Sequence, residues 1–276
     1  NGECPVPIVA PCSPADCFDM TFEAVRLAIE FMTPVFLLSD GYLANGAEPW
    51  QIPEVDELPD LRVDFATAPN GEAADGEAVF LPYLRDPETL ARPWAIPGTA
   101  GMQHRVGGLE KADRTGNISY DPDNHDLMTR LRQAKVDGIA AGLPPTEVDD
   151  PDGDARVAII GWGSTYGPIG AACRQIRNSG RSVAQIHLRH LNPLPADLGK
   201  VLAQYDRVIC PEMNLGQLAL LLRAKFLIDV QSHTQVRGLP FRAAELAAVV
   251  QDVIDAVDPA SAAPSAAPSD ASGGSQ

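Results

Sequence analysis

The chain has 276 residues, 45% of them hydrophobic, a length that predicts about two domains. Its formal net charge of −16 disfavours nucleic acid and anionic membranes as partners, because like charges repel. No apolar run reaches the roughly 18 residues that a membrane span needs. The five cysteines are odd in number and scattered, which argues against a disulfide framework and predicts a cytoplasmic location.

The first 49 residues predict the end of a larger α/β domain. Short apolar runs at residues 5–10 and 35–38 are typical of buried strands, and a helical segment lies between them, which makes one β-α-β unit. Two parallel strands do not form a stable sheet by themselves. We therefore expect the rest of this domain to lie upstream or to be supplied by another chain.

The helix of this unit has a clear predicted start. Ser13 is a typical N-cap, Pro14 suits the first helical position, and Asp16 follows three residues after the cap. Alternating steps of four and three residues predict one buried face, made of Phe18, Phe22, Val25, Ile29 and Met32.

Asp40 and Asn45 follow the second strand of the unit. Ligands of open α/β sheets bind beyond the carboxyl ends of the strands. These two side chains therefore either cap the local turn or contact a ligand.

Residues 50–150 are predicted to be an irregular connecting arm. Its first part is rich in acidic residues, and glycine and proline are dense from residue 82 to 124. Such a long irregular stretch is uncommon inside a compact domain, so we expect it to pack on another subunit. A helix is expected at residues 126–141, with Arg130, Arg132 and Lys135 exposed.

Residues 151–257 predict a second α/β domain, because strand-like and helix-like segments alternate. Such alternation indicates a mostly parallel sheet with right-handed crossovers. The composition of residues 258–276 predicts a disordered tail. The expected strands are 156–161, 183–188 and 208–211, and the expected helices are 165–179, 196–205, one that follows Asn214, and one near 246–257.

The turn at residues 161–167 has three glycines but does not match a dinucleotide fingerprint. It has one residue too many before the third glycine, and the following strand lacks the acid that binds ribose. Two interpretations stay open for Gly163, Ser164 and Thr165. They bind an anion at the helix N-terminus, or they form a tight turn in which Ser164 or Thr165 caps the helix.

Asn214 is expected to cap the next helix, with Gln217 completing a capping box. Leucines on most sides of this helix predict that it is buried. His187 and His190 are expected on opposite faces of a strand, which excludes a shared metal. We therefore expect no catalytic residue and no metal ligand within the chain. The predicted cofactor-binding residues are Asp40, Asn45, Gly163, Ser164, Thr165, Asn214 and Gln217.

Six segments together resemble the alpha subunits of 2-oxoacid:ferredoxin oxidoreductases, most closely the 2-oxoglutarate type. They are SPADCF at 13–18, PVFLLSDGYLANG at 34–46, GGLE at 107–110, GWGST at 161–165, RHLNP at 189–193 and PEMNLGQ at 211–217.

The resemblance implies an α/β chain made of the end of a thiamine-diphosphate pyrimidine-type domain and a transketolase C-terminal-like domain. It implies an enzyme that turns a 2-oxoacid and coenzyme A into acyl-CoA, CO2 and reduced ferredoxin. A beta subunit would carry the thiamine diphosphate, its magnesium and a [4Fe-4S] cluster, in an α2β2 assembly. The cofactor-activating glutamate of the family matches no residue here, so we expect this chain alone to be inactive and to work with the N-terminal remainder of the alpha subunit.

Two other functions stay open at this point. The chain could be a non-catalytic module for assembly or dimerisation, or the C-terminal part of a thiamine-dependent dehydrogenase that has no iron-sulfur cluster.

Overall fold

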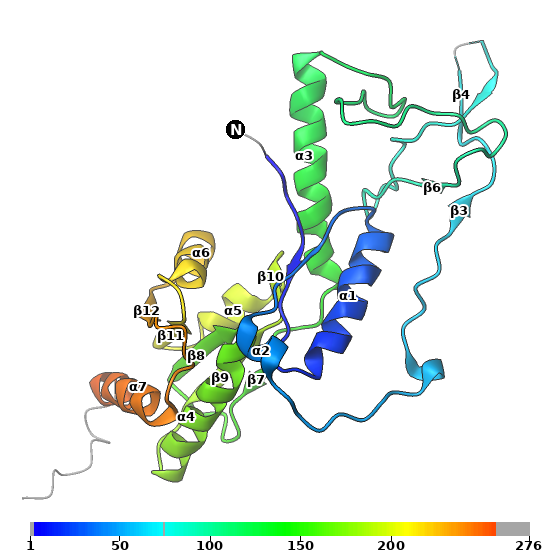
Figure 1. Ribbon diagram of the computed structural model, residues 1–276. Helices are drawn as coiled ribbons and strands as arrows, with labels where there is room; N and C mark the ends of the chain where they lie inside the picture. The colour runs from blue at the N-terminus through cyan, green and yellow to red at the C-terminus, as the bar shows by residue number, and fades with distance from the viewer. Residues whose placement is uncertain (1–2, 74, 258–276) are drawn as a thin grey trace, which may run out of the picture.

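The computed structural model describes residues 3–73 and 75–257, which form two α/β units and a long arm (Figure 1). The α/β class predicted from the sequence is confirmed. The predicted disordered tail at 258–276 lies outside the described residues.

The larger sheet belongs to the second unit and has the strand order β12-β11-β8-β9-β7. Neighbouring strands are parallel except for the β7–β9 pair, so the mostly parallel sheet is confirmed. The strands are β7 (Val148–Asp149), β8 (Val157–Trp162), β9 (Ala184–Leu188), β11 (Arg207–Glu212) and β12 (Val230–Thr234).

Helices cover both faces of this sheet. Side chains of a strand alternate between its faces, and β8 divides accordingly. Val157 and Ile159 pack in one core cluster with α4 (Tyr166–Asn178) and α7 (Ala243–Val257). Ala158 and Ile160 belong to a second cluster with α5 (Leu198–Leu202) and α6 (Gln217–Phe226). The core of the unit is therefore two apolar layers on either side of one sheet.

Two helices differ from the prediction. The helix expected at 196–205 is a regular α-helix only over the five residues of α5. The prediction that α6 is buried on most sides is wrong, because Leu220 and Leu221 are 68% and 58% exposed while Leu218 and Leu222 are buried. The helix packs on β11 and β12 at one end of the sheet, so only one stripe of leucines reaches the core.

The first unit is a small sheet of order β10-β1-β2. Strands β1 (Ile8–Val9) and β2 (Phe36–Leu37) are parallel, which confirms the β-α-β unit. Its third strand, β10 (His190–Asn192), comes from the second half of the chain and pairs antiparallel with β1. The prediction that 35–38 is buried is wrong, since β2 lies at the edge of the sheet and Phe36 is 56% exposed.

Helix α1 (Asp16–Glu30) starts two residues later than predicted, with Ala15 as its N-cap. The predicted buried face is also wrong. The core side of α1 carries Met20 and Leu27, which cluster with Phe31, whereas Val25 is 40% exposed. The helix is apolar on two sides, and spacing alone does not show which side meets β1. Phe18 of the predicted face packs instead against the rings of Phe22 and Trp50.

The arm between the units is built from very short elements. Helix α2 (Gly41–Asn45) ends the first unit, and the arm after it contains a 3-10 turn at Val55–Glu57, the parallel pair β3 (Phe65–Ala66) and β6 (Trp94–Ala95), and the antiparallel pair β4 (Gly71–Glu72) and β5 (Ala78–Val79). Helix α3 (Pro122–Gly138) follows, capped by Asp121 and continued by a 3-10 turn at Ile139–Gly142.

Lys135 of α3 is not exposed as predicted. It is only 7% exposed, because its ammonium group donates to the carbonyl oxygens of Phe31 and Met32 at the end of α1, at 2.8 and 3.2 Å. Arg132 is half-buried, and Arg130 is exposed as expected. Contact with α1 therefore decides the exposure of this face of α3.

Candidate functional site

Two of the predicted site residues meet at the interface between the units. Asp40 is the N-cap of α2, where one carboxylate oxygen accepts from the backbone N–H groups of Tyr42 and Leu43 at 3.0 and 2.9 Å. Its other oxygen accepts a hydrogen bond from the hydroxyl of Ser164. Both oxygens of Asp40 therefore have partners within the chain, and the carboxyl ends of two separate sheets face each other here.

The glycine turn that carries Ser164 is tightly packed. A side chain at Gly161 would come within 2.4 Å of Ile169 and 2.7 Å of the Thr165 hydroxyl, and Gly163 has a φ of +59°. The Thr165 hydroxyl donates to the carbonyl of Trp162 at 2.7 Å and accepts from its N–H at 3.1 Å. Thr165 is the N-cap residue of α4 without a side-chain cap hydrogen bond, and Ser164 bonds to the carboxylate of Asp40.

Asn214 and Gln217 lie beyond the carboxyl end of β11, the neighbour of β8 in the sheet. Asn214 is not the N-cap, because Gly216 takes that position with a φ of +87° and moves the helix start to Gln217. The side-chain oxygen of Asn214 still accepts from the N–H groups of Gly216 and Gln217 at 2.8 and 3.0 Å. On the first unit, the amide of Asn45 donates to the carbonyl of Gly41 at 2.7 Å.

Glu212 is a site residue that the sequence analysis did not single out. It is fully buried and accepts from the N–H groups of Leu218 and Ala219 at 2.9 and 3.0 Å, which places a carboxylate at the positive end of α6. Asn214 and the Trp162 indole donate to the same group at 3.0 and 3.3 Å. Glu212 thereby joins the β11 turn to the β8 turn.

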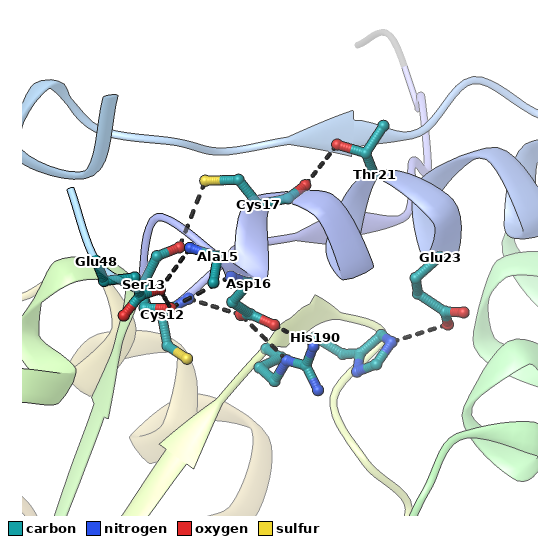
Figure 2. A network of polar contacts seen from close by, with 10 residues as sticks. Cys12, Ser13, Ala15, Asp16, Cys17, Thr21, Glu23, Glu48 and His190 are labelled. Atoms are coloured by element: carbon teal, nitrogen blue, oxygen red, sulfur yellow. Dashed lines mark hydrogen bonds and ion pairs between the residues drawn. The ribbon is translucent and has the colours of Figure 1, made fainter. Parts of the chain in front are cut away.

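A second set of contacts fixes α1 to the segment that leads from β9 into β10, and so ties the second half of the chain to the first unit. We call it the interface network: Asp16, Glu23, Arg189 and His190. Asp16, at the start of α1, accepts from the guanidinium of Arg189 and from the N–H of Cys12 at 2.8 Å. The ring of His190 donates to Glu23 at 3.0 Å. Figure 2 shows Asp16, Glu23 and His190 along the side of α1 that faces β10.

Electrostatics favour the ionised form of Glu23. Burial raises the pKa of its carboxyl group, but hydrogen bonds from His190 and Arg26 outweigh burial and lower the pKa to about 2. The sequence contained a signal for this network, since Arg189 and His190 belong to one of the motifs. Their carboxylate partners are about 170 positions away, and spacing does not connect them.

His187 and His190 have different surroundings, as their placement on opposite faces predicts. His187 packs edge-on against Tyr166 of α4 with ring centroids 5.0 Å apart. Both of its ring nitrogens are buried without a hydrogen-bond partner in the described part of the chain. Burial lowers the pKa of His187 to about 4, so the ring is neutral at pH 7.

The predicted cofactor-binding residues do not form an open set of donors. Asp40, Asn45, Thr165 and Asn214 all have internal hydrogen-bond partners. These contacts hold the four side chains within the chain. Among residues 3–73 and 75–257, no group of three His, Cys, Asp or Glu side chains could hold a metal ion, and no helix is long and apolar enough to cross a membrane.

Comparisons with known proteins identify the family. The 2-oxoglutarate oxidoreductase subunit KorA of Mycobacterium tuberculosis is 59% identical over 246 residues, which cover 89% of this chain and 36% of the relative. This chain belongs to the 2-oxoacid:ferredoxin oxidoreductase family. Residues 2–121 match the family model described as "Pyruvate flavodoxin/ferredoxin oxidoreductase, thiamine diP-bdg". The resemblance seen in the six motifs is confirmed.

Two further members of the 2-oxoacid:ferredoxin oxidoreductase family extend the match. The alpha subunit of 2-oxoacid:ferredoxin oxidoreductase 2 of Aeropyrum pernix is 30% identical over 92% of this chain and 39% of its own length. A structure of the Magnetococcus marinus 2-oxoglutarate:ferredoxin oxidoreductase, with 2-oxoglutarate, coenzyme A and succinyl-CoA bound, superposes with a TM-score of 0.81 and 31% identity. It covers 92% of this chain and 43% of that chain. The chain thus spans well under two thirds of the length of these relatives.

Proposed function

We propose that this chain is part of the alpha subunit of a thiamine-diphosphate-dependent 2-oxoglutarate:ferredoxin oxidoreductase. The reaction converts 2-oxoglutarate and coenzyme A into succinyl-CoA and CO2 and passes two electrons to ferredoxin. The observation that carries this proposal is the superposition over 92% of the chain on an enzyme that was solved with 2-oxoglutarate, coenzyme A and succinyl-CoA bound.

In this proposal the chemistry is divided between chains. A beta subunit holds the diphosphate of the cofactor, its magnesium and the [4Fe-4S] cluster, and two copies of each subunit form an α2β2 assembly in the cytoplasm. The resemblance of the six motifs supports this division. The cofactor carries the chemical step, and the protein orients it and excludes water.

We propose that the chain positions its two domains, at residues 1–49 and 151–257, around the cofactor cleft, with residues 50–150 as the arm that packs on another subunit. The Asp40–Ser164 contact supports this role because it joins the units directly, and the interface network supports it because it ties the chain after β9 to α1. Asp40, Asn45, Gly163, Ser164, Thr165, Asn214 and Gln217 line the strand ends where such a cleft would lie. Their internal hydrogen bonds favour positioning over direct contact with the cofactor.

The test is an activity assay on the assembled complex, purified with its beta subunit and the complete alpha subunit. We expect reduction of ferredoxin that requires both 2-oxoglutarate and coenzyme A, and a brown iron-sulfur chromophore. Pyruvate in place of 2-oxoglutarate is the control for substrate choice. A colourless complex, or turnover without coenzyme A, would contradict the proposal and favour a thiamine-dependent dehydrogenase.

A further inference from the structure

Three arginines of the arm and of α3 gather at one place, and we call them the arginine cluster: Arg85, Arg92 and Arg132. Arg92 lies over the ring of Tyr83 with its guanidinium carbon 4.4 Å from the ring centroid, and Arg85 lies at 5.8 Å from the same ring. Arg132 comes from α3, and each of the three is close enough to lower the pKa of buried Lys135. The cluster is an exception in a chain whose net charge is −16.

The cations of the cluster are not compensated by carboxylates. Within the described ranges 3–73 and 75–257, no Asp or Glu oxygen lies within 4.0 Å of a side-chain nitrogen of Arg85, Arg92, Arg132 or Lys135. Asp113 acts on Arg85 only from a longer distance. Three acidic residues line the same pocket as Arg92: Asp60 pairs with Arg62, Glu30 pairs with Arg26, and Asp64 forms no ion pair within 4.0 Å among the described residues.

Two hydrogen-bond donors of the cluster also lack an acceptor among the described residues. The Nε atoms of Arg85 and Arg132 are buried and have no partner in the described part of the chain. Arg85 uses one terminal nitrogen on the carbonyl of Leu90 at 3.2 Å, and Arg132 uses one on the Thr129 hydroxyl at 3.3 Å. A buried donor without an acceptor costs stability, and an unseen ion is a common explanation. Lys135 differs, because two carbonyls at the end of α1 satisfy it.

We propose that the arginine cluster binds a phosphate-type oxyanion, held by guanidinium groups from the arm and from α3. Planar guanidinium groups match the oxygens of phosphate and bind them with charge-assisted hydrogen bonds. Several cations without a carboxylate in direct contact favour a doubly charged anion over a neutral ligand. The bound anion joins the arm to α3 through the guanidinium groups of the cluster. This site is independent of the proposed oxidoreductase activity.

The test is calorimetric titration of the purified protein with inorganic phosphate, with chloride holding the ionic strength constant. We expect saturable binding to one site per chain. The double variant Arg85→Gln/Arg132→Gln should bind roughly tenfold more weakly or worse, the effect of losing charge-assisted hydrogen bonds. Arg130→Gln is the matched control, because Arg130 lies on the same helix but is exposed and paired with Asp126, and it should bind phosphate normally.

Absence of saturable binding in the wild-type protein, or equal affinity in the double variant, would overturn the proposal. If the double variant does not fold, Arg92→Gln gives the same test with one change. Titration with adenosine monophosphate distinguishes the source of the anion. Tighter binding than inorganic phosphate assigns the site to a phosphate group on a larger molecule, and weaker binding assigns it to the free ion.

Discussion

The interface network and the arginine cluster are two groups of cations that the same chain treats differently. In the interface network, Arg189 meets Asp16 and His190 meets Glu23, so each cation has a carboxylate from a segment about 170 positions away. In the cluster, Arg92 and Arg85 lie near the ring of Tyr83. Arg85 donates to a backbone carbonyl and Arg132 to a threonine hydroxyl, and none of the three arginines has a paired carboxylate among the described residues. The first group is complete within the chain, and the second needs an anion from outside. Lowering the pH should therefore reduce the free energy of unfolding through the interface network, whereas raising the pH should increase it through Lys135 beside the arginine cluster.

The largest effect is expected from Asp16→Ala at the interface. The change removes the acceptor for the Cys12 N–H and leaves Arg189 without its carboxylate. We expect a loss of about 3 kcal/mol in the free energy of unfolding, measured with urea. Asp19→Ala on the exposed side of the same helix is the control and should cost under about 0.5 kcal/mol. Equal losses for both variants would show that the network does not hold the units together.

Acid should weaken the interface through Glu23. Its pKa falls from 4.5 in the unfolded chain to about 2 in the folded protein. Its stabilisation is therefore fully present above pH 4.5 and is lost as the pH falls toward 2. Across this pH range, we expect the free energy of unfolding of the wild-type protein to fall by roughly 2 kcal/mol more than that of Glu23→Gln. The control is Glu30→Gln, because Glu30 is an exposed residue of the same helix that pairs with Arg26. In this variant the free energy of unfolding should depend on pH as it does in the wild type.

Raising the pH should stabilise the protein through Lys135, which lies beside the arginine cluster. Burial and the nearby arginines lower the pKa of Lys135 from 10.5 to about 8. The unfolded chain therefore binds more protons between pH 8 and 10.5, and the Lys135 contribution to stability rises with pH in that window. We expect a rise of roughly 2 kcal/mol in the wild type relative to Lys135→Met. If the free energies of unfolding of the two proteins change with pH in the same way, the pKa of Lys135 is not lowered by its cationic neighbours.

The smallest effect concerns the contact between Asp40 and Ser164. Ser164→Ala should cost about 1 kcal/mol, because one hydrogen bond between the units is lost. Asp40→Ala should cost more, since it also removes the cap of α2. A double-mutant cycle isolates the shared contact, and a coupling energy near zero would show that the two side chains do not interact in solution.

The sequence predicted those parts of the fold that depend on local periodicity. The parallel order of β8, β9 and β11 followed from alternating strands and helices. Residue type placed tight turns at Gly163 and Asn214, but it named Asn214 and not Gly216 as the N-cap of α6. The fold class and the family were therefore accessible from the residues alone. The motifs also placed Asp40 and Ser164 at strand ends, although residue spacing does not predict their mutual contact.

Contacts between distant segments were not accessible in this way. The core side of α1 is Met20 and Leu27 because that side meets β1, and spacing favoured the other apolar side. Lys135 is buried because the end of α1 offers it two carbonyls from about 100 positions away. The addition of β10 to the first sheet and the pairing of Asp16 with Arg189 have the same origin. Each depends on how two units meet, which single-segment patterns do not contain.

Amide hydrogen exchange, with and without inorganic phosphate at constant ionic strength, tests most directly whether the interface network is complete and the cluster is not. We expect phosphate to slow exchange in the arm around Arg85 and Arg92 and in α3, and to leave β1 and β10 unchanged. Equal slowing in both regions, or no slowing in either, would contradict this account.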